Sequence, residues 1–373
     1  MNSDSLRIAS ISDIHLGHHN TTTMEILANL RRAFPDNEIT GELDLIFIVG
    51  DVFDRLLQLP DNNALEIKFW INQFLRMCAR RDIVVRVLEG TPSHDWGQSR
   101  LFTATNEVGE INADLKYIDR LDIDYIERFG ITVLCIPDEW LPETDDIWKE
   151  VQRTLKQHGL KQVDFALMHG CFKYQLPAHV QVPRHEEERY LSIVRHYILI
   201  GHHHKHSMHE RIIAQGSFDR LSHNEEEPKG HVRLTLRATG DDDIVFVENK
   251  HAKVYHTIDC RGLDIEAAFN KVKADLDHPE GSFLRIRANR EDPIMSAIDV
   301  LRGRYPQFNW SPPKVDGGVL RKEDIQQNLK IKYDVLNITP NNIEELIMER
   351  IKKRNVSREL QVCCERLLNG VIG

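Results

Sequence analysis

Residues 43–54 read LDLIFIVGDVFD and join a hydrophobic run to two carboxylates. The consecutive apolar residues 45–49 are rich in β-branched side chains, a composition typical of a buried strand. Gly50 follows the run directly, and its missing Cβ atom lets the chain turn sharply. Asp51 and Asp54 come next. The stretch therefore predicts a strand that presents acidic side chains at its carboxyl end.

Four other segments repeat this construction along the chain. Strand-like runs at residues 6–11, 83–88, 163–168 and 197–200 each precede a short polar segment. The polar segments are Asp13-Ile14-His15, Ser93-His94-Asp95, His169-Gly170 and Gly201-His202-His203-His204. Functional groups collect at the carboxyl ends of strands in open α/β sheets, so we expect the five segments to meet at one rim.

The spacing within these segments suits metal ions. Asp13 and His15 are two residues apart, as are His202 and His204, and side chains two apart in an extended chain point to the same side. Asp51 has two carboxylate oxygens and can bridge two ions about 3.5–4 Å apart. Each segment alone is an ordinary turn, cap or adventitious chelator. All five segments occur in the order given, and each follows a strand-like run. Together they predict a two-metal hydrolytic site, and hence phosphoester cleavage.

With these motifs the chain resembles the calcineurin-like metallophosphoesterase superfamily, whose pattern runs Asp-x-His, Gly-Asp-x-x-Asp or His, Gly-Asn-His-Asp, His and Gly-His-x-His. Within that superfamily it is most similar to the SbcD-type nuclease subunit of DNA double-strand-break repair complexes. The closer likeness rests on residues 50–54, 200–205 and 216–221, followed by Glu225-Glu226-Glu227 and Lys229-Gly230. It covers residues 6 to 240 and implies an α/β fold: a metallophosphoesterase β-sandwich flanked by helices, with a small α+β capping domain and a C-terminal helical segment.

The resemblance also implies roles for individual residues. One metal ion would be held by Asp13, His15, Asp51 and His204, and the other by Asp51, Ser93, His169 and His202. His94 would stabilise the transition state or protonate the leaving oxygen, and Asp95 would orient His94. Two Mn²⁺ ions are the usual cofactors of this type, with Mg²⁺ as the other candidate.

One segment departs from the family pattern. Where the family has Gly-Asn-His-Asp, this chain has Pro92-Ser93-His94-Asp95, so a serine hydroxyl replaces the amide oxygen that ligates the second metal. Pro92 restricts Thr91 and can push Ser93 toward the ions. Two interpretations stay open: an active enzyme in which Ser93 suffices, and a degenerate site kept for structure or regulation.

The resemblance divides the chain into a nuclease domain at 1–240, a DNA-capping-like domain at 241–318 and a C-terminal partner-binding segment at 319–373. In the second part, residues 246–248, 253–258 and 282–287 are predicted strands around a helical pattern at 265–276. Apolar residues at helical spacing in the tail predict two helices. In related nucleases such helices bind an SMC-like ATPase of the SbcC type, and we expect that partner here; packing against their own domain is the alternative.

Composition limits the function classes. The formal charge of −10 opposes a nucleic-acid substrate, because DNA binding relies on Lys and Arg at phosphates, although local patches such as residues 285–290 carry arginines. Those arginines fit a solvated face equally well. No apolar run reaches the roughly 18–20 residues of a membrane span, and the N-terminus has no signal-segment pattern. Six cysteines without a Cys-x-x-Cys motif predict reduced thiols. We therefore expect a cytoplasmic protein with no membrane partner.

Together these features predict a metal-dependent DNA exonuclease or endonuclease that hydrolyses phosphodiester bonds through an activated water, in DNA repair or recombination. A homodimer is expected, with the predicted helix at 62–80 packing internally or between subunits. A phosphomonoesterase or cyclic phosphodiesterase of the same superfamily, and a catalytically weakened scaffold subunit, are the alternatives.

Overall fold

The computed structural model describes residues 5–57, 62–138, 141, 143–177, 179–180 and 182–316. By its internal contacts the chain forms two compact units. The first comprises Met1–Ala288 with Asp292–Lys314, and the second comprises Asn289–Glu291 with Val315–Gly373. The fold described below is that of the first unit. The C-terminal helices predicted after residue 340 lie outside the described residues.

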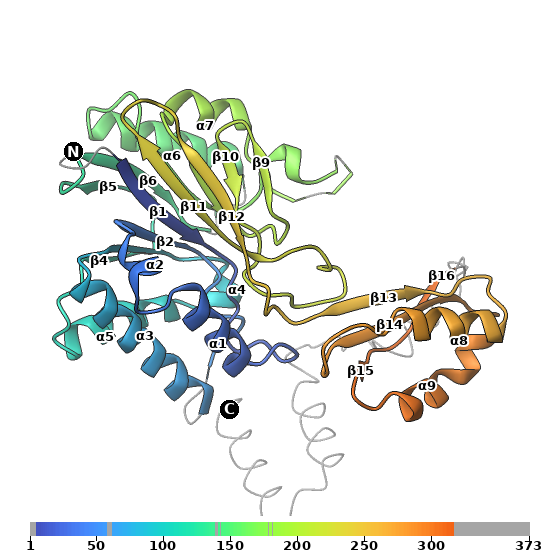
Figure 1. The fold of residues 1–373 in the computed structure, drawn as a ribbon. Coiled ribbons are helices and arrows are strands. Elements are labelled where there is room, and N and C mark those ends of the chain that lie inside the picture. Colours follow the sequence, from blue (N-terminus) through green and yellow to red (C-terminus); the bar gives the residue numbers. More distant parts are fainter. Residues whose placement is uncertain are drawn as a thin grey trace, which may run out of the picture. The chain divides into compact units, whose positions relative to one another are not determined.

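The first unit contains a six-stranded mixed sheet (Figure 1). Its strands run in the order β12 (Asp243–Glu248), β11 (Gly230–Arg237), β1 (Ser5–Ile11), β2 (Leu45–Val49), β3 (Val84–Leu88) and β4 (Leu115–Ile118). Strands β1 to β4 pair in parallel, whereas β11 and β12 are antiparallel to their neighbours. The carboxyl ends of β1, β2 and β3 therefore lie at the same edge.

A second six-stranded mixed sheet has the order β5 (Asp122–Ile126), β6 (Ile131–Ile136), β7 (Phe165–His169), β8 (Ile198–Gly201), β10 (Ile212–Ala214) and β9 (Ser207–His209). Strands β6, β7, β8 and β10 are parallel, and β5 and β9 are antiparallel edges. The strands predicted before Asp13, Gly50, Ser93, His169 and Gly201 are thus confirmed as β1, β2, β3, β7 and β8.

The two sheets pack against each other through alternate residues of their central strands. On β2, Leu45, Phe47 and Val49 share a core with Phe165 and Leu167 of β7. The intervening residues of β2 pack in a separate core on the outer face of the first sheet. Because side chains alternate across a strand, a fully apolar run is what a strand buried on both faces requires.

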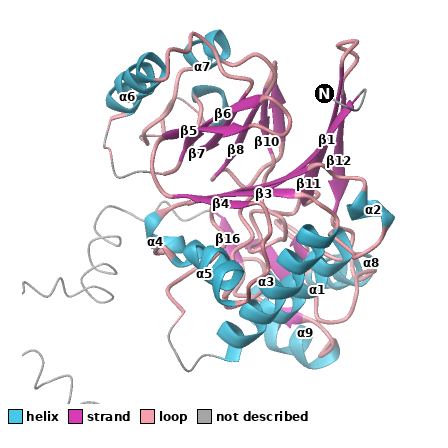
Figure 2. Cartoon of the chain, turned by 90° about the vertical axis from the view of Figure 1, so that its left-hand side faces the viewer, coloured by secondary structure: helices cyan, strands magenta, loops and turns pink. Residues whose placement is uncertain are grey.

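Helices cover the outer faces of both sheets (Figure 2). The first sheet is covered by α1 (Thr23–Ala33), α3 (Asn62–Arg80) and α5 (Leu101–Val108), and the second by α6 (Thr144–Gln157) and α7 (Glu187–Ile193). Short helical turns complete this part: α2 (Glu38–Gly41), α4 (Pro92–Asp95), η1 (Gln98–Arg100) and η2 (Lys173–Gln175). The described helices include none that is long and apolar enough to cross a membrane.

Residues beyond β12 form a smaller α+β element with its own core. Three strands pair in parallel in the order β13 (Tyr255–Asp259), β14 (Phe283–Asn289) and β15 (Asn309–Trp310). Helix α8 (Ile265–Ala274) connects β13 to β14, and η3 (Pro293–Ala297) with α9 (Ile298–Arg304) connects β14 to β15. The short strand β16 (Lys314–Asp316) follows β15 in the chain. Ile258, Val272, Ile286 and Leu301 are buried in that core.

The structure corrects one boundary within this region. Residues 246–248 were predicted as part of the α+β element, but β12 pairs with β11 in the first sheet. The expected division after residue 240 falls inside the β11–β12 hairpin, where Gly240 has a φ of 79°. β12 lies at the edge of the first sheet, and its apolar residues 244–247 do not by themselves show which sheet the strand joins.

Candidate metal centre

The polar segments lie at the carboxyl ends of parallel strands in the two sheets. Asp13 and Asp51 follow β1 and β2, and the Asp13 and Ile14 amides donate to the carbonyls of Gly50 and Asp51. His169 ends β7 and pairs with Gly201 at the end of β8. Both sheets therefore contribute to one rim, and three groups of potential ligands form there.

The first group consists of Asp13, His15 and His204. The Nε2 atoms of His15 and His204 are 3.1 Å apart, and His204 Nε2 lies 3.8 Å from Asp13 Oδ1. Asp51 Oδ2 is 3.8 Å from His15 Nε2. Asp13 and His15 are buried and His204 is partly exposed, and one carboxylate and two imidazoles converge in this group.

The second group consists of Asp51, His169 and His202. His169 Nε2 lies 3.2 Å from Asp51 Oδ1, whereas the other oxygen of Asp51 faces the first group. Asp51 and His169 are buried and His202 is exposed. One carboxylate thus has an oxygen beside each group, the arrangement that a ligand shared by two ions requires.

Thr91 joins the second group although the sequence interpretation did not select it. Its Oγ1 lies 3.3 Å from Asp51 Oδ2, 3.4 Å from His169 Nε2 and 3.3 Å from His202 Nδ1. Its backbone amide donates to Asp51 Oδ1 at 2.6 Å. Ligand atoms about 2.1 Å from a tetrahedral ion are separated by about 3.4 Å. The Thr91 hydroxyl therefore lies at the separation expected between neighbouring ligands from both histidines of the second group.

Among the described residues, no hydrogen bond joins Ser93, the residue predicted to fill that position, to the second group. It is exposed, and its carbonyl accepts a hydrogen bond of 2.8 Å from Trp96 Nε1. The reason is local: Pro92 starts α4, so Ser93 is already within a helical turn, whereas Thr91 is still extended with φ −61° and ψ 125°. The hydroxyl that contacts His169 and His202 is that of Thr91, because the chain turns between Thr91 and His94.

His94 lies beside the first group. Its ring meets the His15 ring edge to face at 5.0 Å, and it belongs to a third group with His15 and Asp54. His94 Nδ1 is 2.9 Å from the Asp54 carbonyl oxygen, so a proton on Nδ1 would donate to that carbonyl. The ring's Nε2 is then the atom available to a substrate.

Asp95 does not orient His94, and that prediction is wrong. Its two carboxylate oxygens accept hydrogen bonds from the backbone amides of Phe53 at 2.8 Å and Gly90 at 2.7 Å. Complete burial, with Asp51 and Glu89 nearby, raises the pKa of Asp95 well above its usual range. Asp95 ties together the loops after β2 and β3, and the Asp54 carbonyl takes the partner role at His94.

The backbone at the centre is strained. Asp13, His15 and Asp51 have φ values of 51°, 54° and 48°, and His202 has a φ of 90°. Such angles are uncommon for residues with a Cβ atom, and they cluster at functional sites. Gly50 also has a positive φ of 79°, and a Cβ there would lie 2.1 Å from His169 Nδ1. Tight turns therefore bring the ligand side chains together.

This geometry revises the spacing argument. Asp13 and His15 do share a group, but through left-handed backbone rather than an extended chain. His202 and His204 belong to different groups. The two-residue spacing correctly predicted that Asp13 and His15 share one group, but wrongly predicted the same for His202 and His204. Local turns of the backbone decide where each of these side chains points.

The Asp51 carboxylate and the His169 imidazole lie in direct contact in the second group. Burial disfavours the charge of Asp51, but His169, His15 and His94 outweigh burial and lower the pKa of Asp51. Burial also opposes protonation of His169, yet Asp51 raises the pKa of His169 to about 10. A metal ligand must be neutral imidazole, so binding of a cation here would displace that proton.

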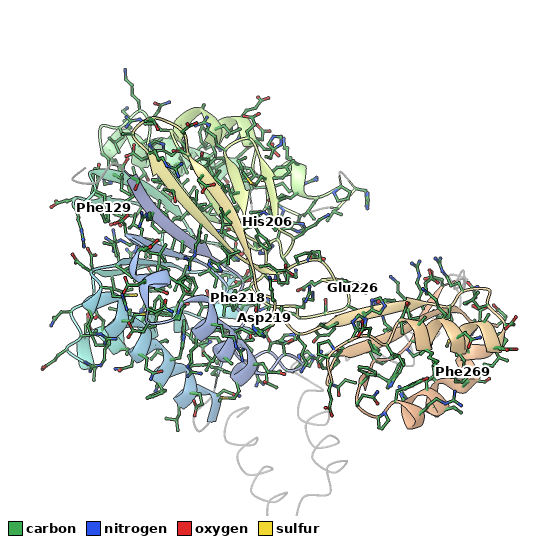
Figure 3. All side chains as sticks on the ribbon, in the orientation of Figure 1. Phe129, His206, Phe218, Asp219, Glu226 and Phe269 are labelled. Atoms are coloured by element: carbon green, nitrogen blue, oxygen red, sulfur yellow. The ribbon has the colours of Figure 1, made fainter. Side chains whose placement is uncertain are left out.

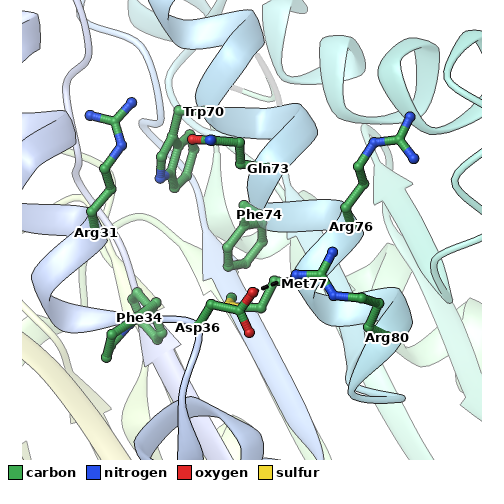
Figure 4. Close-up of a pocket in the computed structure, with 10 residues that line it drawn as sticks. Arg31, Phe34, Asp36, Trp70, Gln73, Phe74, Arg76, Met77 and Arg80 are labelled. Carbon is green, nitrogen blue, oxygen red and sulfur yellow. Dashed lines mark hydrogen bonds and ion pairs between the residues drawn. The ribbon is translucent and has the colours of Figure 1, made fainter.

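A separate cavity lies between α1 and α3 (Figure 4). Its volume is about 320 Å³, and Trp70, Phe74 and Phe34 form apolar walls rimmed by Arg31 and Arg76. Its lining residues include no member of the three groups. The candidate chemistry therefore resides at the rim of the sheets and not in this cavity.

Comparison with known proteins leaves the family open. No protein-family model matches the chain, and no curated protein matches it. Among solved structures, TT1561 of Thermus thermophilus matches with a TM-score of 0.38 and 14% identity, over 64% of this chain and 98% of that one. GAP50, described as the anchor in the inner membrane complex of Plasmodium, matches with a TM-score of 0.38 and 15% identity, over 68% of this chain and 87% of that one.

Proposed function

We propose that this chain is a two-metal phosphodiesterase that hydrolyses DNA, a nuclease of the SbcD type within the metallophosphoesterase superfamily. The observation that carries the proposal is Asp51, which has one carboxylate oxygen beside each of two histidine-containing groups. Shared carboxylates of this kind belong to two-metal hydrolytic sites. The strained turns that converge on the site support the same interpretation.

The donor set fits two divalent ions of the Mn²⁺ or Mg²⁺ kind. Asp13, His15, Asp51 and His204 would hold one ion, and Asp51, Thr91, His169 and His202 the other. When bound, two such ions lower the pKa of a water toward neutrality and stabilise charge on the attacking and leaving oxygens. The carboxylates of Asp13 and Asp51 are ligands that suit Mn²⁺, and the choice of Mn²⁺ rests on the sequence resemblance.

His94 is the proposed proton donor to the leaving oxygen. The Asp54 carbonyl lies 2.9 Å from Nδ1, which favours a proton on that nitrogen and fixes the ring plane. Protonated His94 can then donate from Nε2 to the leaving oxygen as a general acid. Asp95 acts indirectly, because its contacts with Phe53 and Gly90 hold the loops that carry Asp51 and Thr91.

DNA as the substrate rests on the sequence resemblance across residues 216–230 and on the α+β element that follows the first sheet. A catalytically weakened scaffold is the second candidate, and one observation favours it: a neutral hydroxyl, from Thr91, stands where an amide oxygen ligates the second metal in the family pattern.

We also propose a homodimer through α3. Leu65 and Phe69 are one helical turn apart on this helix and are 65% and 56% exposed. Residues four apart share a helix face, so the two side chains form an apolar patch on the outer side of α3. The SMC-like ATPase of the SbcC type is proposed as the partner of the C-terminal segment, which lies outside the described residues.

The test is degradation of linear duplex and single-stranded DNA with Mn²⁺, with Mg²⁺ and with chelator. Asp51→Ala and His94→Ala are the active-site variants. His209→Ala is the matched control, because His209 belongs to the same histidine-rich tract but to none of the three groups. Metal-dependent cleavage lost in the first two variants and kept in the third supports a nuclease. Cleavage of a small phosphodiester but not DNA would favour another phosphoesterase, and no cleavage of either would favour the scaffold.

A further inference from the structure

Residues 215–229 connect β10 to β11 and lie against the His202–His204 turn. The Ser217 amide donates to the His204 carbonyl at 3.0 Å. Gly216 has a φ of 76°, and a Cβ there would lie 2.6 Å from the His206 amide nitrogen and 2.8 Å from the His204 carbonyl. This connecting segment thus approaches the turn as closely as the backbone allows.

Glu225 in the connecting segment contacts His204 directly. Its Oε1 is 2.9 Å from His204 Nδ1, the ring nitrogen that points away from the first group. Its Oε2 accepts hydrogen bonds of 3.2 Å from the Ser217 hydroxyl and from the Leu221 amide. Glu225 is 9% exposed, so its carboxylate is held in one place by several donors.

Lys229 completes the network from the other side. Its side chain is only 1% exposed, and its Nζ donates to the His204 carbonyl at 2.7 Å and to Glu227 Oε1 at 2.8 Å. Nζ also lies 3.5 Å from Glu225 Oε2. Buried lysines occur when paired, and here the pairing holds both the backbone of His204 and the carboxylate behind its ring.

His204 must present an unprotonated nitrogen to bind a metal. If Nδ1 carries the proton and donates it to Glu225, then Nε2 has its lone pair free. That atom lies 3.1 Å from His15 Nε2 and 3.8 Å from Asp13 Oδ1. A carboxylate behind a ligand histidine fixes the tautomer and ring orientation and strengthens the ligand.

We propose that Glu225, held by Ser217, Leu221 and Lys229, is a positioning residue that prepares His204 to bind the first of the two metals. The inference rests on the proposed two-metal function and extends it. The inference gives a structural role to Glu225 and Lys229, two residues that in the sequence only contribute to the resemblance to SbcD-type nucleases. Only the first of the three glutamates reaches His204; Glu227 pairs with Lys229, and Glu226, labelled in Figure 3, faces His256 at 3.7 Å.

The test measures Mn²⁺ binding to the full chain by calorimetry, so its readout is independent of nuclease activity. Glu225→Ala should weaken one of two Mn²⁺ sites by about 10–100-fold, the usual effect of removing such a partner. Glu225→Gln should weaken it less, because the amide oxygen still accepts from Nδ1 although the charge is lost. Glu226→Gln is the matched control and should bind Mn²⁺ like the unchanged chain.

Thermal unfolding without metal separates positioning from folding. If Glu225→Ala fails to fold, Glu225→Gln carries the test. Nitrogen NMR of the metal-free chain at alkaline pH adds a second readout: the His204 proton should reside on Nδ1 in the unchanged chain and lose that preference in Glu225→Ala. Wild-type Mn²⁺ affinity in a folded Glu225→Ala variant, or equal losses in Glu225→Gln and Glu226→Gln, would overturn the inference. Absence of Mn²⁺ binding in the unchanged chain would instead refute the proposed function itself.

Discussion

Substitution of Thr91 tests the composition of the second metal group. Thr91→Ala removes the hydroxyl that lies 3.3–3.4 Å from Asp51, His169 and His202 but leaves the backbone amide that donates to Asp51. The Thr91 side chain makes no capping hydrogen bond to α4, so the helical turn should survive. Loss of one neutral contact to a charged centre is worth about 2 kcal/mol, which corresponds to about 30-fold weaker binding.

The assay is a Mn²⁺ titration of binding and of DNA cleavage, with Ser93→Ala as the control. Thr91→Ala should shift the weaker Mn²⁺ site by about 30-fold and raise the Mn²⁺ concentration needed for cleavage by a similar factor. Ser93→Ala should change neither, because Thr91 and not Ser93 has its hydroxyl beside Asp51, His169 and His202. Thr91→Asn restores the amide type of the family pattern and should bind at least as tightly as the unchanged chain. A larger loss in Ser93→Ala than in Thr91→Ala would refute this assignment.

Three further predictions concern assembly, pH and the core. Leu65→Glu combined with Phe69→Glu should give a folded monomer by light scattering, because both side chains are exposed on α3; a dimer that persists would remove this surface from consideration. Burial lowers the pKa of His185 from 6.5 to about 4. Between these two pH values the unfolded chain binds a proton that the folded chain does not, so the free energy of unfolding should fall as the pH drops from 6.5 to 4, by at most about 3 kcal/mol. His185→Gln should flatten the pH dependence of chemical unfolding across that window, and an unchanged slope would contradict the assignment. Phe47→Ala between the sheets should lower the free energy of unfolding by about 3–5 kcal/mol, whereas Val108→Ala on the surface should change it little; similar values for both would argue against the face-to-face core.

The strands were predictable because their physical requirement is local. Residues 45–49 and 165–168 are apolar at every position, and a strand covered on both faces needs that pattern. The helix at 62–80 was predicted with the bounds that α3 has. The pairing of β12 with the first sheet was not predictable, because a short apolar run between two acidic residues carries no mark of the sheet it joins.

The candidate site shows the same division. Asp13, His15, Asp51, His169, His202 and His204 were selected from sequence because each follows an apolar run, and the structure brings all six together at one rim. Thr91 was missed because the turn into α4 changes which hydroxyl faces the site. Pro92 was the available signal, because proline is favoured at the first position of a helix and therefore indicates that a helical turn begins directly after Thr91.

Sequence by itself therefore determined which strands form and which side chains end them, since hydrophobic periodicity and residue chemistry are properties of short segments. Tertiary structure alone decided which hydroxyl joins the second group, that Asp95 ties loops while the Asp54 carbonyl contacts His94, and that Glu225 and Lys229 close around His204. Those contacts join residues up to 111 positions apart, and they depend on the packing of both sheets rather than on the neighbouring residues.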